Sequence, residues 1–132
     1  MQDIARSEAF AVPAVEDPQS FVHQFAETNG IRSHYVEEGQ GPLVILLHGF
    51  PYCWYMWRRQ IRTLAAAGYR VVAPDIRGFG QSDCPADPQA CDMQNCVGDL
   101  VALMQALGES AAVIVGHDLG AWVAYAAAQR RP

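Results

Sequence analysis

Residues 112–120 read Ala-Val-Ile-Val-Gly-His-Asp-Leu-Gly, and an alanine-rich stretch with a helical pattern follows them directly. The apolar run has the length of a buried strand, so the sequence predicts a strand that turns sharply into a helix at Asp118. Glycines stand two residues before and after this aspartate, at Gly116 and Gly120, where a small residue lets strand and helix approach closely. Aspartate also tolerates a left-handed backbone better than most residues.

This pattern has the form of a nucleophile elbow, Gly-x-Nuc-x-Gly, with Asp118 where serine is more common. A carboxylate with an ordinary pKa of about 3.9 is ionised at neutral pH without a base. Its attack on an ester would give a reactive anhydride, whereas attack on a carbon bearing a strained oxygen or a halide gives a stable alkyl ester. The pattern therefore favours epoxides or alkyl halides as substrates. The alternative is a structural turn in which Asp118 caps the helix.

Composition limits the possible partners. The 132 residues carry a formal net charge of −5 and are 51% hydrophobic, which is enough for one globular core. The mild acidity argues against nucleic acid or an anionic membrane as a partner, and no apolar run reaches the ~20 residues of a membrane span. The first residues show no basic region followed by an apolar one, so we expect a cytoplasmic protein.

The cysteines do not indicate a metal site. Four of them lie at irregular spacing, without a Cys-x-x-Cys pair or a neighbouring histidine pair. We expect free thiols and no metal or cofactor, with a disulfide as the lesser alternative. These are Cys53, Cys84, Cys91 and Cys96.

The chain is expected to hold one domain over residues 20–132, preceded by a flexible lead-in over residues 1–19 that lacks clear periodicity. Strand-like patterns cover residues 21–28 and 31–37, and Asn29-Gly30 between them is a strong hairpin signal.

Three continuous apolar runs follow, at residues 43–47, 70–73 and 111–115. Continuous apolarity predicts strands buried on both faces, as in a parallel sheet. Helical patterns at residues 57–65 and 97–107 lie between these runs. This alternation predicts an α/β fold with a doubly wound, mostly parallel sheet. Ligands of such sheets bind beyond the carboxyl ends of the strands.

Three motifs follow these strand ends, so they converge on one rim: His48-Gly49-Phe50-Pro51 with Trp54-Tyr55-x-Trp57-Arg58, residues 73–83, and residues 116–120. In this order they resemble the N-terminal part of an α/β-hydrolase of the epoxide hydrolase and haloalkane dehalogenase branch. The resemblance covers roughly residues 25–132. It implies the α/β-hydrolase fold, truncated here after the helix that follows the elbow.

The resemblance also implies roles for particular residues. Asp118 would be the nucleophile, and the backbone N–H groups of Phe50 and Leu119 would form the oxyanion hole. Phe50 and Trp54 would line the substrate pocket, whereas Trp57 is expected in the core. The Phe50–Pro51 peptide bond is expected to be cis. The remaining motif residues would be structural, and the His48 side chain would hold its loop in place. These structural residues are His48, Gly49, Pro51, Gly116 and Gly120.

Within this branch the sequence resembles epoxide hydrolases most closely. Haloalkane dehalogenases place tryptophan after the nucleophile to hold the halide, and fluoroacetate dehalogenases place arginine there, but this chain has Leu119. Epoxide hydrolases also usually carry tryptophan at that position, although the backbone amide donor is retained. The resemblance implies a small-molecule epoxide as substrate and no cofactor, with a dehalogenase of the same branch as the alternative.

In this family the charge-relay acid, the catalytic histidine and the lid tyrosines follow later strands. All of them would lie beyond Pro132, so we expect the 132-residue chain to be a fragment that is inactive by itself. None of the four histidines fits the catalytic position; we expect His23 and His34 at the surface or in the sheet, and the His117 side chain pointing away from the pocket. The alternative from another class is a non-catalytic binding protein with half a hydrolase fold.

Overall fold

The computed structural model describes residues 15–131, which form a five-stranded sheet of order β1-β2-β4-β3-β5. Strand β3 pairs in parallel with β4 and β5, whereas β2 pairs antiparallel with β1 and β4. Only β2 therefore runs against the other described strands, and the expected mostly parallel sheet is confirmed. The strands are β1 (Val22–Thr28), β2 (Ile31–Glu38), β3 (Leu43–Leu47), β4 (Arg70–Pro74) and β5 (Val113–Gly116).

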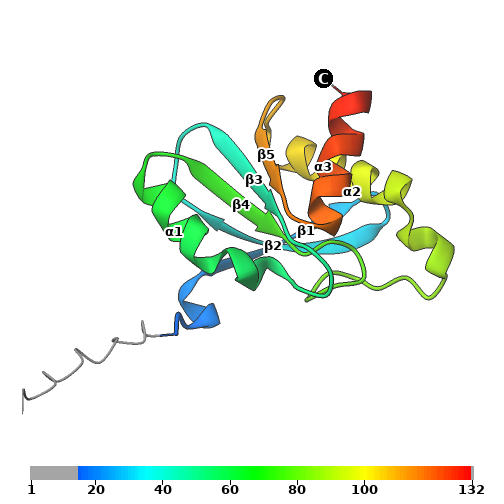
Figure 1. Ribbon diagram of the computed structural model, residues 1–132, viewed down its shortest axis with the longest axis horizontal. Helices are drawn as coiled ribbons and strands as arrows, with labels where there is room; N and C mark the ends of the chain where they lie inside the picture. Colours follow the sequence, from blue (N-terminus) through cyan, green and yellow to red (C-terminus); the bar gives the residue numbers. More distant parts are fainter. Residues whose placement is uncertain (1–14, 132) are drawn as a thin grey trace, which may run out of the picture.

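Helices cover both faces of this sheet, as the doubly wound prediction requires. Helix α1 lies on one face, and α2 and α3 lie together on the other (Figure 1). Three short 3₁₀ helices complete the order of elements. The helices are η1 (Pro18–Ser20), η2 (Trp54–Trp57), α1 (Arg58–Ala66), η3 (Pro88–Cys91), α2 (Met93–Ala106) and α3 (Leu119–Arg130).

Strand β3 explains why its sequence is apolar throughout. Successive side chains of a strand point to opposite faces, and here each face is covered by helices. Val44 and Leu46 pack in the cluster under α1 with Ile61, whereas Ile45 and Leu47 pack in the cluster under α2 and α3. All five residues of β3 are buried.

The run at residues 111–115 behaves differently, and the expected burial on both faces is wrong for it. Val113 is 60% exposed and Val115 is 37% exposed, whereas Ile114 packs against the cluster under α2 and α3. Strand β5 is at the edge of the described sheet, beyond the reach of α1. Its second face therefore lacks a cover among residues 15–131.

Local residues fix the ends of several elements, and the hairpin expected at Asn29-Gly30 is present. Asn29 and Gly30 have positive φ angles of 47° and 82° and join β1 to β2 in a tight hairpin. The Asp92 carboxylate caps α2 by accepting a hydrogen bond from the Asn95 N–H at 2.8 Å, which satisfies an otherwise unpaired donor of the first turn.

Most of the expected lead-in, residues 1–14, lies outside the described residues. Residues 15–19 are described, and the Glu16 carboxylate accepts a hydrogen bond at 3.2 Å from the Arg62 guanidinium on α1. The Glu16 carbonyl also accepts a hydrogen bond from the Tyr55 hydroxyl on η2. Within residues 15–131, the helices are too short or too polar to cross a membrane.

Candidate active site

Asp118 occupies a tight turn between β5 and α3. Its φ of 53° and ψ of −118° lie outside the backbone regions that side-chain-bearing residues usually adopt. A Cβ at Gly120 would lie 2.2 Å from the Leu47 carbonyl oxygen, and one at Gly116 would lie 2.4 Å from the Gly120 carbonyl oxygen. Both glycines are therefore required by close backbone approach, as the sequence predicted.

The Asp118 carboxylate is exposed at this turn and faces a backbone donor from another loop. The Phe50 N–H donates a hydrogen bond of 3.0 Å to its Oδ2. This bond, and to a lesser degree the nearby Leu119 N–H, lowers the pKa of the Asp118 carboxyl below its usual 3.8. Gly49 permits the approach, because a Cβ there would lie 2.7 Å from the Asp118 Cβ.

The loop that carries Phe50 is fixed by the His48 side chain. His48 is fully buried, and its Nε2 accepts a hydrogen bond of 2.9 Å from the Ile76 N–H. Its Nδ1 must then carry the proton that it shares with the Gly49 carbonyl at 3.0 Å. Burial lowers the pKa of His48, which favours this neutral form. The Phe50–Pro51 peptide bond in the same loop is cis.

Asp75 joins this loop to the second motif. Its side chain is almost fully buried; Oδ1 accepts a hydrogen bond of 2.8 Å from the Trp54 N–H, and Oδ2 accepts one of 2.9 Å from the Gln81 N–H. Oδ2 also lies 2.7 Å from His34 Nδ1. The sequence placed Asp75 in a motif without giving it this role, and the available signal was a carboxylate directly after the buried run of β4.

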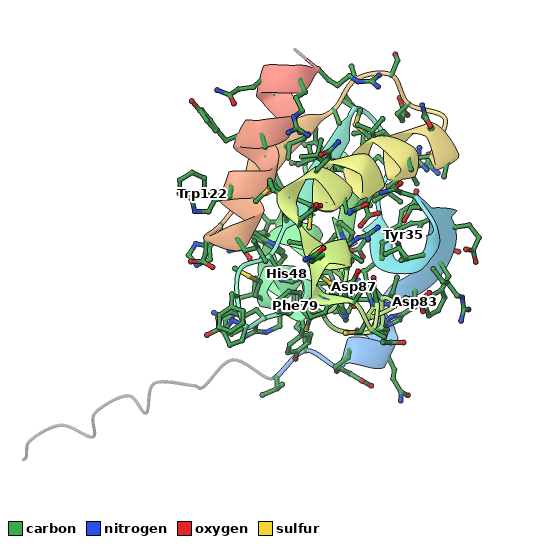
Figure 2. All side chains as sticks on the ribbon, turned by 90° about the vertical axis from the view of Figure 1, so that its right-hand side faces the viewer. Tyr35, His48, Phe79, Asp83, Asp87 and Trp122 are labelled. Carbon is green, nitrogen blue, oxygen red and sulfur yellow. The ribbon has the colours of Figure 1, made fainter. Side chains whose placement is uncertain are left out.

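The aromatic residues divide between surface and core. The Phe50 ring is 67% exposed and meets the Phe79 ring edge-on at 6.0 Å, and Phe79 in turn packs against His48 (Figure 2). The Trp54 ring is only 4% exposed and packs against Phe21 in the cluster under α1. The expectation that Trp54 lines the pocket is thus not met, because η2 turns its ring into the core. Trp57 packs against the same cluster, as expected.

Asp118 is exposed, and two cavities in the described part of the chain lie away from it: one of about 30 Å³ beneath Asp75, and one of about 440 Å³ between α2 and the end of α3. None of the four histidines donates a hydrogen bond to the Asp118 carboxylate. His117 is exposed, and its backbone N–H pairs with Leu47.

The parallel strands, the helices on both faces and the tight turn at Asp118 together define an α/β hydrolase. Residues 42–132 match the family described as the alpha/beta hydrolase fold, and the chain belongs to it. An epoxide hydrolase of Caballeronia sordidicola is 51% identical over 105 residues, which are 80% of this chain and 32% of that protein. Epoxide hydrolase B of Mycobacterium tuberculosis is 47% identical over 86% of this chain and 33% of its own length.

Among solved structures, too, epoxide hydrolases are similar to this chain. An epoxide hydrolase from Vigna radiata superposes with a TM-score of 0.85 at 43% identity, covering 89% of this chain and 37% of that one. An epoxide hydrolase from an endophytic Streptomyces gives a TM-score of 0.83 at 51% identity, over 85% and 34% of the two chains. This chain spans about a third of the length of the curated relatives it matches.

Proposed function

We propose that this chain carries the nucleophile half of an epoxide hydrolase active site, with Asp118 as the nucleophile. The observation that carries the proposal is the exposed Asp118 carboxylate at the turn, with the Phe50 N–H 3.0 Å from its Oδ2. The similarity to proteins named epoxide hydrolases supports the choice of substrate class. A cytoplasmic location remains part of the proposal, and cell fractionation tests it.

The geometry supports a two-step reaction. In the first step an Asp118 oxygen attacks an epoxide carbon, the carbon–oxygen bond of the ring breaks, and the freed alkoxide takes a proton from a donor outside the described residues. Water then adds to the ester carbonyl of Asp118 and releases the diol. The oxyanion of this second step would be stabilised by the backbone N–H groups of Phe50 and Leu119.

The electrostatics favour an anionic nucleophile. Both amide donors lower the pKa of Asp118, so its carboxylate is charged at any pH above about 4 without an adjacent base. His48 is buried and neutral, and it serves to hold the loop. The arrangement therefore needs a base only for the hydrolysis of the ester.

A chimaeric enzyme tests this proposal. The 105 residues of this chain that match the Caballeronia sordidicola relative replace their counterparts there, and the remainder of that relative stays unchanged. We expect diol formation from styrene oxide by this chimaera and a loss of at least about a thousandfold in the Asp118→Asn variant, because an amide is not an anionic nucleophile. Leu119→Ala keeps the backbone donor and should lower the rate by less than about tenfold.

The matched control is Asp83→Asn, an exposed carboxylate on the same rim that bonds the Arg32 N–H. A folded chimaera whose Asp118→Asn variant keeps its activity, without conversion of the asparagine back to aspartate, would rule out the proposed nucleophile. Release of chloride from a chloroalkane at a rate exceeding that of diol formation would instead favour a dehalogenase.

A further inference from the structure

A chain of hydrogen bonds runs from Asp75 to the protein surface through two histidines. The Asp75 Oδ2 lies 2.7 Å from His34 Nδ1, and His34 Nε2 lies 2.8 Å from His23 Nδ1. His23 Nε2 lies 2.8 Å from the Pro18 carbonyl oxygen. His34 is fully buried and Asp75 is 2% exposed, whereas His23 is half-buried.

The number of protons in this chain of hydrogen bonds follows from the groups at its two ends, the Asp75 carboxylate and the Pro18 carbonyl. The Pro18 carbonyl can only accept a hydrogen bond, so His23 Nε2 must carry a proton. Each of the three links needs one bridging proton. An ionised Asp75 and two neutral imidazoles supply only two N–H groups. The chain is therefore complete only with one further proton, which makes its total charge zero.

The surroundings of Asp75 decide where this proton resides. Its carboxylate accepts N–H groups from Trp54 and Gln81 as well as from His34, and three such donors stabilise the ionised form. Among the described residues no lysine or arginine bonds to Asp75, and His34 is the group that can supply a positive charge to it by taking up a proton. A positive charge shared by His34 and His23 satisfies both requirements.

Other charged or titratable groups surround this chain of hydrogen bonds, but none of them bonds to the ring nitrogens of His34 or His23. The Asp75 charge acts on both His48 and Cys53. Arg32 lies over the Phe25 ring that packs on His34, and its backbone bonds to Asp83. On α1, the Arg62 guanidinium is paired with acidic residues. These groups are His48, Cys53, Arg32, Asp83 and Arg62.

The same carboxylate fixes the loop that presents the Phe50 amide. The Asp75 Oδ1 accepts the N–H of Trp54 at one end of the loop, and His48 at the other end accepts the N–H of Ile76, the next residue along. The position of the Phe50 N–H relative to Asp118 therefore depends on where the Asp75 side chain is held.

We propose that Asp75 is ionised and that His34 and His23 share one positive charge. This hydrogen-bonded ion pair positions the Phe50 amide opposite Asp118. The three are positioning residues, since none of them touches the reacting atoms. Only the catalytic benefit of this device rests on the proposed function; the proton count and the position of the amide are properties of the folded chain.

Nitrogen NMR of the ¹⁵N-histidine-labelled 132-residue chain at pH 7 tests the proton count. We expect three protonated ring nitrogens in His23 and His34 together, and one protonated nitrogen in the internal reference His48. Two neutral imidazoles at His23 and His34 would overturn the proposal, and this measurement needs neither a variant nor enzymatic activity.

Hydrogen exchange of the Phe50 amide tests the positioning. In Asp75→Asn the single side-chain oxygen cannot accept both the Trp54 N–H at the Oδ1 position and the His34 and Gln81 groups at the Oδ2 position. We therefore expect Phe50 exchange to become about tenfold faster while Ile45 in β3 stays protected. Asp83→Asn is the matched control and should leave both amides unchanged. If Asp75→Asn does not fold, His23→Gln at the half-exposed end replaces it. Wild-type exchange of Phe50 in a folded variant of either kind would overturn the positioning role.

Discussion

At the scale of single residues, the elbow around Asp118 is a place of close backbone approach. The Asp118 φ of 53° is accommodated because the two neighbouring glycines let the Leu47 backbone, Gly116 and the first turn of α3 come into direct contact. A methyl group at Gly120 has no space to enter, since the atoms it would meet are backbone atoms of a central strand. The conformation of the proposed nucleophile is thus fixed by its neighbours.

Replacement of Gly120 by alanine should therefore be costly. We expect Gly120→Ala to lower the free energy of unfolding by about 3 kcal/mol or more in urea denaturation, because its Cβ would lie 2.2 Å from the Leu47 carbonyl oxygen. Gly98→Ala in α2 is the control: its nearest neighbour is the Asn29 side-chain amide, which can move, so the change should stay within about 1 kcal/mol. Equal effects of the two substitutions would contradict this steric account.

The cysteines should differ strongly in reactivity. Burial raises the pKa of the Cys96 thiol to about 11, whereas Cys84 and Cys91 are exposed. Because the thiolate is the reactive form, iodoacetamide at pH 8 should modify Cys96 about a hundredfold more slowly than an ordinary exposed thiol. Peptide mass mapping over time measures the rates, and unfolding in urea should equalise them. Rapid modification of Cys96 in the folded chain would show that it is not protected.

Much of the site could be predicted from the sequence, because each motif has a local cause. The glycines around Asp118 indicated a tight turn, and the His-Gly-Phe-Pro motif led to the Phe50 amide. Two features had no local signal. The burial of the Trp54 ring depends on how η2 packs on the sheet, and the link between Asp75 and His34 joins residues 41 positions apart in the sequence.

At the scale of elements, β5 shows that an apolar sequence pattern predicts a strand but does not determine how far that strand is buried. Strands β3 and β5 have equally apolar sequences, and the sequence correctly predicts both as parallel strands. Burial, however, depends on which helices cover a strand. In the described chain, α1 packs over β2, β4 and β3 and does not extend to the edge strand β5, so the face of β5 that carries Val113 is open (Figure 1). Figure 2 shows that Trp122 also projects outward from α3, where it is 67% exposed.

This open edge should make the isolated chain prone to association. An exposed apolar strand with unpaired backbone groups invites pairing with another chain. We expect Val113→Lys to slow aggregation, measured by light scattering at 37 °C, and to change the free energy of unfolding by less than about 0.5 kcal/mol. Val15→Lys, at a residue 82% exposed and outside the sheet, is the control. Equal slowing by both variants would point to net charge and not to the strand edge.

At the scale of the whole molecule, the described chain holds the proposed nucleophile, Asp118, and one amide donor hydrogen-bonded to it, but no imidazole bonded to Asp118. His48, His34 and His23 are engaged in other hydrogen bonds. Ester formation needs the carboxylate as nucleophile and a proton for the freed alkoxide, which solvent water can supply slowly, whereas ester hydrolysis needs a positioned base to activate water. In this chain we therefore expect the ester to form on Asp118 without being efficiently hydrolysed.

We accordingly expect residues 1–132 alone to release less than about one diol per protein molecule from styrene oxide, even after long incubation. Chromatographic quantification of the diol, with a protein-free blank for spontaneous hydrolysis, gives this number. Many diols per molecule that disappear in the Asp118→Asn variant would reveal a base among the residues present here and would overturn this assignment.

The identity of the alkylated residue is the most direct test of the central claim. The cysteines of the 132-residue chain are first blocked with N-ethylmaleimide, the protein is incubated with styrene oxide, and the adduct is located by peptide mass mapping. We predict a single ester on Asp118, formed equally well from about pH 5 to pH 8 because the pKa of this carboxyl lies below 3.8, and absent in Asp118→Asn. An adduct that forms on other carboxylates as readily as on Asp118, or that persists in Asp118→Asn, would contradict the account.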